Sequence, residues 1–308
     1  MSLKKPKFWD YKKPNFLAYL LFPISLLLQI FNPHKYNHDV QKLKIKKICI
    51  GNFYIGGTGK TSLSIKINEI LNKRNIKSCF IKKLYKNQRD EQRILENSGR
   101  LFLSRNRIDA LKQAEKENFH IAIFDDGLQD KSIEYDKSFV CFNTINWIGN
   151  GMTIPSGPLR ENLKNLKKYK HVFLNGNLEN IQIYKEKILE INSDITIHIG
   201  KYEIKNLGDF NINEKYLAFS GIGNHQTFIA MMKSYSFEIL KDIEFPDHYE
   251  YLQNDIDKIL NEAKKLGCKI ITTEKDYLRL ENKINDKINF IKSELKILDE
   301  NKLIQSII

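Results

Sequence analysis

A glycine-rich turn joins an apolar run to an amphipathic run near residue 55, and this junction restricts the fold more than any other feature. The run Ile45–Asn52 predicts a buried strand. The segment Thr61–Arg74 places its aliphatic residues at helical spacing and predicts a helix. The turn between them reads GGTGKT. A strand, a glycine-rich loop and a helix in this order are typical of α/β proteins that bind phosphate groups.

The loop keeps only part of the strict phosphate-loop pattern G-x-x-x-x-G-K-[ST], because Tyr54 stands where that pattern has glycine. Its glycines let backbone N–H groups turn toward phosphate oxygens, beside the positive end of the helix. Lys60 can reach the β- and γ-phosphates of a nucleotide and is a candidate catalytic residue, and Thr61 can bind Mg²⁺. A chance glycine-rich turn is the alternative. The candidate nucleotide-binding residues of the loop are Gly56, Gly57, Thr58, Gly59, Lys60 and Thr61.

Short apolar runs alternate with longer amphipathic segments from residue 44 onward, which indicates βαβ units. We predict an α/β fold with a P-loop NTPase-like, mostly parallel sheet flanked by helices. The predicted parts are an N-terminal segment at 1–43, a P-loop core at 44–205 and a smaller C-terminal α/β lobe at 206–308. Further predicted strands are Ser78–Lys83, Ile121–Asp125, Ser138–Asn143, His171–Leu174, Ile195–Ile204, Tyr216–Ser220 and Lys269–Thr272; further predicted helices are Asp90–Asn97, Asp109–Glu117, Arg160–Tyr169 and one from about Asn224.

Two carboxylates follow the buried run IAIF. Asp125 and Asp126 come at the end of this predicted strand. A carboxylate at that place beside a phosphate loop can hold Mg²⁺ directly or through water. The alternative is a turn or a helix cap, the usual role of an aspartate that ends a strand. With the phosphate loop upstream, we predict a metal role for both residues.

The N-terminus carries the uncharged stretch Phe16–Phe31 behind a run of lysines. As a helix it would span about 24 Å, less than the roughly 30 Å hydrocarbon core of a bilayer, and Pro23 would kink it. Lysines beside an apolar segment favour an anionic membrane surface. We predict an interfacial membrane-associating helix. A buried core helix, a spanning segment and a signal peptide are the alternatives, although no A-x-A-like cleavage site follows.

The chain has a net charge of +13, which suits a nucleotide, a nucleic acid or an acidic membrane as partner. A sequence bias toward Lys, Ile and Asn explains the charge equally well. The basic residues are dispersed and no nucleic-acid-binding module is recognised, so we predict no nucleic-acid partner. The cysteines form no C-x-x-C pair and lie in or beside apolar runs, which predicts buried reduced thiols and a reducing compartment. They are Cys49, Cys79, Cys141 and Cys268.

Six motifs occur in an order that resembles the tetraacyldisaccharide 4′-kinase family of lipid A biosynthesis. They are IGNFYIGGTGKT, FDDGLQ, IPSGPLRE, FSGIGN, FPDHYEY and TTEKD, and they span most of the chain. The resemblance implies a monomeric P-loop kinase on the cytoplasmic face of the bacterial inner membrane, bound peripherally or monotopically. It implies transfer of the γ-phosphoryl group of ATP, with Mg²⁺, to the 4′-hydroxyl of a tetraacylated glucosamine disaccharide 1-phosphate. The product would be lipid IVA.

The resemblance also implies roles for single residues. Asp90 is the implied base for the acceptor hydroxyl, and His248 of the FPDH motif supports it as a dyad. The alternatives are that Asp90 is a helix N-cap and that His248 is a turn residue. Glu91 is an implied Mg²⁺ ligand. The remaining implied assignments are Asp126 and Gln129 for nucleotide binding, and Arg160, Glu161, Lys83 and Asn52 for substrate recognition.

Three positions depart from the family pattern. Lys83 stands for the arginine of the usual S-R-G-Y-G and loses its planar fork. Leu84 replaces the following glycine, so the loop conformation is expected to differ. Asp130 replaces the histidine that closes D-D-G-L-Q-H, which places any function of that histidine in doubt.

A second class of protein shares the G-G-x-G-K-T loop, namely membrane-associated P-loop ATPases that act as switches. Their loop normally opens with a lysine just before the two glycines, where this chain has Ile55. A nucleic-acid-binding NTPase is a third reading, prompted only by the net charge. We expect kinase activity, and keep the switch ATPase as the alternative function.

Overall fold

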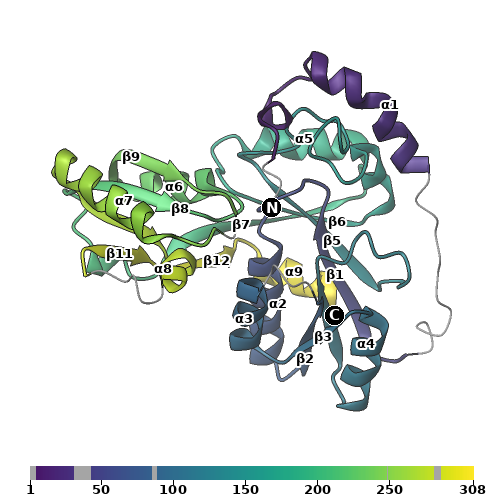
Figure 1. The fold of residues 1–308 in the computed structure, drawn as a ribbon. Helices are drawn as coiled ribbons and strands as arrows, with labels where there is room; N and C mark the ends of the chain where they lie inside the picture. The colour runs from purple at the N-terminus through teal and green to yellow at the C-terminus, as the bar shows by residue number, and fades with distance from the viewer. Residues whose placement is uncertain (1–4, 31–42, 85–88, 248, 281–285) are drawn as a thin grey trace. The chain divides into compact units, whose positions relative to one another are not determined.

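The computed structural model describes residues 5–30, 43–84, 89–247, 249–280 and 286–308, with the backbone alone at Ile30, Arg89 and Asp90. The chain forms two compact units (Figure 1). The first comprises Met1–Gly200 together with Ile297–Ile308, and the second comprises Lys201–Lys296. The chain therefore leaves the first unit near residue 200 and returns to it for its last turns.

The main sheet has eight strands in the order β12-β7-β6-β5-β1-β4-β2-β3. β1 lies between β4 and β5 and pairs in parallel with both, which confirms the predicted parallel α/β fold. The elements from the start of the described chain through β7 are η1 (Lys7–Asp10), α1 (Phe16–Ile30), β1 (Lys46–Asn52), α2 (Lys60–Lys73), β2 (Ser78–Lys83), α3 (Arg89–Ser98), β3 (Leu101–Ser104), α4 (Arg107–Lys116), β4 (Ile121–Asp125), β5 (Lys137–Asn143), η3 (Leu163–Lys168), β6 (His171–Asn175), α5 (Ile181–Ile191) and β7 (Thr196–Ile204).

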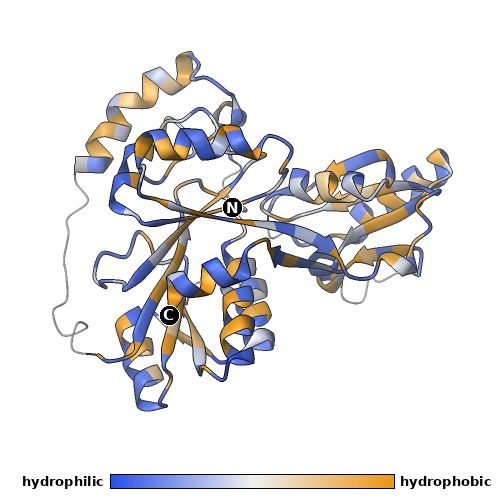
Figure 2. Ribbon diagram, turned by 180° about the vertical axis from the view of Figure 1, so that it is seen from behind, coloured by the Kyte–Doolittle hydropathy of each residue, from blue (hydrophilic) through white to orange (hydrophobic). Residues whose placement is uncertain are grey.

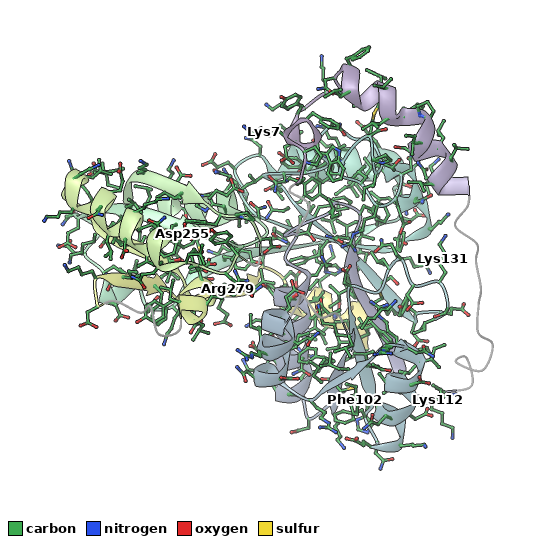
Figure 3. All side chains as sticks on the ribbon, viewed as in Figure 1. Lys7, Phe102, Lys112, Lys131, Asp255 and Arg279 are labelled. Atoms are coloured by element: carbon green, nitrogen blue, oxygen red, sulfur yellow. The ribbon has the colours of Figure 1, made fainter. Side chains whose placement is uncertain are left out.

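Helices cover both faces of the main sheet. α4 and α5 place Leu111 and Ile188 in one apolar cluster with strand residues such as Phe124. α2 packs on β1, β2 and β4 with Leu63 and Ile67 fully buried. Figure 3 shows the expected division of side chains, with Phe102 of β3 inside and Lys112 of α4 pointing outward. Apolar residues on both faces of the parallel strands therefore explain their unbroken hydrophobic runs.

The second unit carries a four-stranded sheet in the order β11-β10-β8-β9. β8 pairs in parallel with β9 and β10, and β10 pairs in parallel with β11. The elements of this part of the chain are η4 (Leu207–Asp209), β8 (Lys215–Ser220), α6 (His225–Ser234), β9 (Glu238–Glu244), α7 (Gln253–Leu266), β10 (Lys269–Thr273), α8 (Glu274–Leu280), β11 (Ile288–Ile291), β12 (Ser293–Ile297) and, back in the first unit, α9 (Glu300–Ile307).

Two expectations from the sequence need correction. The helix predicted at Arg160–Tyr169 is a 3₁₀ helix confined to Leu163–Lys168. Residues 160–162 before it are not helical, because Arg160 N–H donates to the carbonyl oxygen of Phe53 and holds the chain against the phosphate loop. The last turns, predicted within the C-terminal lobe, pack in the first unit instead, where Leu303 and Ile307 are fully buried.

The first unit also contains an apolar helix, α1, and Figure 2 shows that most of its residues are hydrophobic. Ala18 and Ser25 are fully buried, whereas most of its large apolar side chains are exposed. Within the described part of the chain, no helix combines the length and the apolar character that crossing a bilayer requires. The predicted buried thiols are present at Cys49, Cys79 and Cys141, and burial raises the pKa of Cys79 to about 12.

Candidate active site

The predicted phosphate loop connects the end of β1 to the start of α2. Gly56 and Gly59 have φ values of 123° and 81°, in a region that favours glycine, and Gly59 is the N-cap of α2. The backbone N–H groups at the start of α2 are therefore available to an anion. Thr58, Lys60 and Thr61 lie in the loop and the first turn, where the sequence places them.

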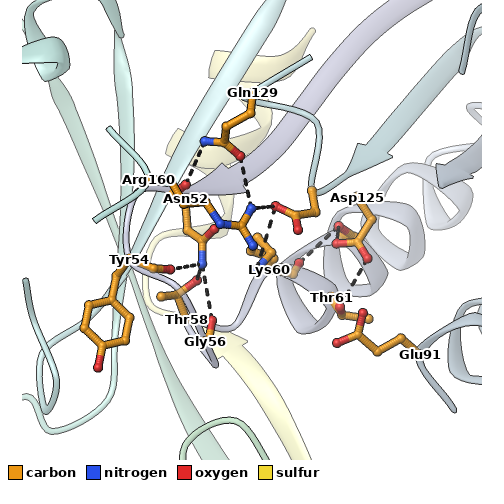
Figure 4. A network of polar contacts seen from close by, with 12 residues as sticks. Asn52, Tyr54, Gly56, Thr58, Lys60, Thr61, Glu91, Asp125, Gln129 and Arg160 are labelled. Atoms are coloured by element: carbon orange, nitrogen blue, oxygen red, sulfur yellow. Dashed lines mark hydrogen bonds and ion pairs between the residues drawn. The ribbon is translucent and has the colours of Figure 1, made fainter. Parts of the chain in front are cut away.

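The side-chain amide of Asn52 contacts this loop at three places (Figure 4). Its Nδ2 donates to the carbonyl oxygen of Tyr54 at 2.6 Å and to Thr58 Oγ1 at 2.9 Å, and lies 3.3 Å from the carbonyl oxygen of Gly56. Asn52 is fully buried. The substrate role implied for Asn52 stays a prediction, and its described contacts stabilise the phosphate loop.

Asparagines at the ends of two further strands hold the same loop. Asn175, the last residue of β6, donates to the carbonyl oxygen of Thr58 at 2.8 Å. Asn143, the last residue of β5, donates to Asn175 Oδ1 at 3.0 Å. This pair was not predicted from the sequence. A polar residue at the end of a buried strand is the signal that could have found them.

Asp126 lies at the centre of a charged cluster above the loop. Its Oδ1 accepts a 2.6 Å hydrogen bond from Arg160 and lies 4.0 Å from Lys60 Nζ. Burial alone would raise the pKa of Asp126, but the nearby charges of Lys60 and Arg160 outweigh it and hold this pKa well below its usual range. Asp126 is therefore ionised and fixes two cations beside the phosphate loop.

Arg160 also connects Asp126 to the predicted residue Gln129 (Figure 4), and Gln129 extends the network to Glu161. Its guanidinium donates to Gln129 Oε1 at 3.0 Å. Gln129 Nε2 in turn donates to Glu161 Oε1 at 3.1 Å and to the carbonyl oxygen of Asn52 at 3.2 Å. The structure thus brings together five of the residues that the sequence singled out, from β1, the loop after β4 and the segment before η3.

Asp125 occupies the deepest position of the cluster and is fully buried. Its Oδ2 accepts from Thr61 Oγ1 at 3.2 Å, and its Oδ1 lies 3.4 Å from Ser64 Oγ. A carboxylate beside the threonine hydroxyl of a phosphate loop is an oxygen donor set that suits Mg²⁺. Among the described residues there is no group of three His, Cys, Asp or Glu that could hold a metal ion. The arrangement therefore fits a magnesium ion that takes its other ligands from phosphate and water.

Lys82, near the end of β2, is a site residue that the sequence analysis did not assign. Its Nζ lies 2.6 Å from Asp125 Oδ2 and 2.8 Å from Glu91 Oε2. Burial alone would lower the pKa of Lys82, but the two carboxylates outweigh it and raise this pKa. The signal in the sequence is a lysine that directly follows the apolar run CFI within the strand SCFIKK. Lys83, the predicted substrate residue, is the last residue of that strand and half-buried.

Asp130, which replaces the family histidine, has a defined partner. Its Oδ2 accepts from Arg107 at 2.9 Å, and Arg107 also donates to the carbonyl oxygen of Asp126 at 2.7 Å. Burial would raise the pKa of Asp130, whereas hydrogen bonds from Ser132 and Arg107 lower it. The departure is therefore accommodated by an ion pair that supports the loop after β4.

The implied catalytic dyad lies largely outside the described residues. Asp90 is in the first turn of α3, but its side chain is not described, and neither is His248. Glu91 is the nearest described carboxylate on that helix. The dyad of Asp90 and His248 remains a prediction.

Three motifs of the second unit meet at Asp276, the aspartate of TTEKD. This fully buried carboxylate accepts hydrogen bonds of 3.0 Å from the backbone N–H of Gly221 and from the Tyr251 hydroxyl. Arg279 donates to Asp276 at 3.0 Å and to the carbonyl oxygen of Gly221 at 2.7 Å. The FSGIGN and FPDHYEY motifs are therefore held by one buried charged group.

A parallel sheet, a glycine-rich loop at its carboxyl edge and a lysine and threonine at the helix start define the class of P-loop nucleotide-binding proteins. The family model described as tetraacyldisaccharide-1-P 4′-kinase matches residues 17–100 and 88–308. The chain therefore belongs to the tetraacyldisaccharide-1-P 4′-kinase family, and the resemblance drawn from the six motifs is confirmed.

Relatives with the same description cover the whole chain. The tetraacyldisaccharide 4′-kinase of Pelagibacter ubique (strain HTCC1062) is 56% identical over 308 residues, which is 100% of this chain and 98% of the relative. That of Rickettsia canadensis (strain McKiel) is 32% identical over 326 residues, which is 100% of this chain and 97% of the relative. The crystal structure of the "apo" form of LpxK from Aquifex aeolicus in complex with ATP superimposes with a TM-score of 0.61 at 22% identity, covering 94% and 96% of the two chains. This likeness supports the fold.

Proposed function

We propose that this chain is an ATP-dependent kinase that transfers the γ-phosphoryl group of ATP to the 4′-hydroxyl of a tetraacylated glucosamine disaccharide 1-phosphate, giving lipid IVA. The carrying observation is the convergence of Lys60 and Arg160 on Asp126 beside the phosphate loop, in a chain of this family. Two cations at one side of the loop are suited to a triphosphate, because phosphoryl transfer depends mainly on positioning and charge neutralisation.

Different groups of the described residues contact different parts of the bound nucleotide. Backbone N–H groups of the loop and the start of α2 bind the phosphates, and Lys60 neutralises charge on the β- and γ-phosphates. Arg160 has donors left for phosphate oxygens after its bonds to Asp126 and Gln129, because a guanidinium carries five N–H groups. Thr61 and Asp125 would hold Mg²⁺, which neutralises developing charge when bound.

The acceptor side of the reaction is assigned by the family resemblance. Asp90 accepts the proton of the 4′-hydroxyl while the hydroxyl oxygen forms a bond to the γ-phosphorus of ATP. The bond from the γ-phosphorus to ADP breaks, and ADP leaves. His248 supports Asp90 in this role. Lys83 and Glu161 recognise the substrate. The position of Asp90 at the start of α3, next to the described residue Glu91, supports a base on the same edge of the sheet as the phosphate loop.

We further propose that α1 docks on the surface of the inner membrane at its cytoplasmic face, and that the enzyme works as a monomer. The helix exposes large apolar residues, among them Phe16, Leu20 and Leu27, which are 79%, 62% and 54% exposed. Exposed lysines at positions 5, 7, 12 and 13 precede it and suit anionic lipid headgroups. A substrate with four acyl chains stays in the bilayer, so the enzyme must reach it there.

The test is transfer of radiolabelled γ-phosphate from ATP to a tetraacyl disaccharide 1-phosphate in detergent micelles. We expect labelled lipid with the natural protein, and a loss of about 10²-fold or more with Asp90→Ala. Labelled lipid that is undiminished in the variant would retain the kinase and remove Asp90 as its base. Labelled phosphate in water with no labelled lipid would identify a switch ATPase instead.

A further inference from the structure

The ammonium group of Lys82 lies between two carboxylates that belong to different elements. Asp125 ends β4, and Glu91 lies in the first turn of α3. The distances from Lys82 Nζ to the nearest oxygens are 2.6 Å and 2.8 Å, and Lys82 is 2% exposed. Lys82 is therefore a buried cation with two ion-pair partners. Both partners lie at the edge of the sheet that carries the phosphate loop.

Without the ammonium group of Lys82, the carboxylates of Asp125 and Glu91 and the Thr61 hydroxyl would form a set of oxygen ligands for a divalent cation. Thr61 Oγ1 lies 3.2 Å from the same oxygen of Asp125 that Lys82 contacts. Removing one partner from a buried ion pair leaves an uncompensated charge at high cost in stability. The side chain of Lys82 therefore supplies the positive charge that this group of oxygens requires.

We propose that Lys82 acts as a resident cation, filling the place between Asp125 and Glu91 so that this pair takes up no Mg²⁺ before nucleotide binds. Glu91 then holds Lys82 and not a metal ion, which replaces the ligand role that the family resemblance implied for it. Mg²⁺ enters with the nucleotide, on the side of Thr61. The entry of Mg²⁺ with the nucleotide rests on the proposed function. The position of Lys82 between the two carboxylates does not depend on that function.

The contact has a second consequence for the acceptor side. Glu91 directly follows Asp90 on α3, so the Lys82–Glu91 ion pair joins the start of this helix to β2 and, through Asp125, to β4. Lys82 is thus a positioning residue for the helix that carries the proposed base.

The experiment measures thermal unfolding of the full chain without nucleotide or lipid, with and without millimolar Mg²⁺. The variants are Lys82→Met, which removes the charge, and Lys82→Arg, which keeps it. Lys47→Met is the matched control, because Lys47 is also a buried strand lysine, and Asp136 at 3.5 Å is its carboxylate partner among the described residues. The double variant Lys82→Met/Glu91→Gln removes one of the two carboxylates.

We expect Mg²⁺ to leave the Tm of the natural protein, Lys82→Arg and Lys47→Met unchanged. It should raise the Tm of Lys82→Met by roughly 3 to 5 °C, because the metal then binds in the place of the ammonium. The double variant should lose most of this rise. If Lys82→Met does not fold, Lys82→Gln keeps a donor without the charge and should show the same rise.

Two results would overturn the proposal. An equal Mg²⁺-dependent rise in the natural protein would show that the carboxylates accept metal in the presence of Lys82. No rise in any charge-removing variant would show that the place between them is not a cation site. Neither result depends on phosphoryl transfer, so failure here is distinguishable from failure of the proposed kinase activity.

Discussion

The side-chain amide of Asn175 donates a 2.8 Å hydrogen bond to the carbonyl oxygen of Thr58, although the two residues are 117 positions apart. Asn175 ends β6, and β5 lies between β6 and the strand that leads into the phosphate loop. The loop is therefore supported by strands on one side of β1 and by Asn52, the last residue of β1 itself.

Replacing this support should weaken nucleotide binding. Asn175→Ala removes the donor to Thr58 and a partner of Asn143, which costs about 1 to 2 kcal/mol for a buried hydrogen bond. We expect the Kd of a fluorescent ATP analogue to rise about 5- to 30-fold. Asn177→Ala, an exposed asparagine two residues further on, is the control and should bind normally. An unchanged Kd in Asn175→Ala would contradict a supporting role.

Arg160 should not be replaceable by lysine. Arg160→Lys keeps the positive charge but cannot contact Asp126 and Gln129 while also reaching a phosphate, because an ammonium lacks the planar fork. We expect kcat/KM for ATP to fall about 10- to 100-fold, the equivalent of one or two charge-assisted hydrogen bonds. Arg100→Lys, in an exposed ion pair with Glu117, should change kcat/KM less than twofold, in keeping with the small energy of such pairs. Steady-state kinetics over a range of ATP concentrations would decide.

The P-loop core was predictable because strand and helix periodicity in this region is strong. Ser78–Lys83 and Ile121–Asp125 are strands with the bounds that the sequence predicts. The phosphate loop and its carboxylates were found from spacing alone. Gln129, Arg160 and Glu161 came from the family resemblance, and the structure brings them together beside the loop.

What the sequence did not predict depends on tertiary contacts. Lys82 looks like a charged interruption of a strand until Asp125 and Glu91 are placed around it. The segment before η3 is not helical because backbone hydrogen bonds join it to Phe53 and Ile55, and no local propensity encodes that pairing. α9 belongs to the first unit although residues 201–296 of the second unit precede it in the chain. Local sequence patterns do not reveal this return.

Acid should destabilise the first unit through two neighbouring histidines on β6 and β7. Burial lowers the pKa of both His171 and His198 from 6.5 to about 4, and nearby lysines add to the effect. The unfolded chain binds these protons more readily, so stability present at pH 7 is lost as pH falls from about 6.5 toward 4. The loss is roughly 1 to 2 kcal/mol for each histidine once solvent screening is allowed for.

Removing one imidazole should reduce this loss. Among the described residues neither ring nitrogen of His198 has a hydrogen-bond partner, so His198→Leu removes no described hydrogen bond. Urea midpoints measured between pH 4 and pH 7 should fall less steeply in His198→Leu than in the natural protein. The charged groups nearest to the pair are Lys137, Lys170, Asp299 and Lys302, and all are kept. His120→Leu, at an exposed site, is the control, and parallel pH profiles for all three proteins would disprove the assignment.

The outward face of α1 should determine binding to lipid. Leu20 and Leu27 are seven positions apart and lie on the same side of the helix, opposite the buried Ala18 and Ser25. Replacing both leucines with aspartate should lower binding to anionic vesicles about 10-fold or more, while ATP binding is retained. Co-sedimentation with vesicles measures the first quantity. The control is Ile183→Asp/Leu189→Asp, which changes two exposed apolar residues of α5 and should bind vesicles normally.

If α1 docks on a membrane as proposed, its inner face makes that helix a spacer. Ser25 Oγ donates to the carbonyl oxygen of Thr153 at 2.9 Å and lies 2.8 Å from Ser156 Oγ. A few residues later the same segment pairs with the phosphate loop, through Tyr54 and Leu159, and then supplies Arg160. A helix resting on a bilayer would therefore set the height of the phosphate loop above the lipid surface. A sugar headgroup at the level of the membrane could then meet the nucleotide without leaving the bilayer.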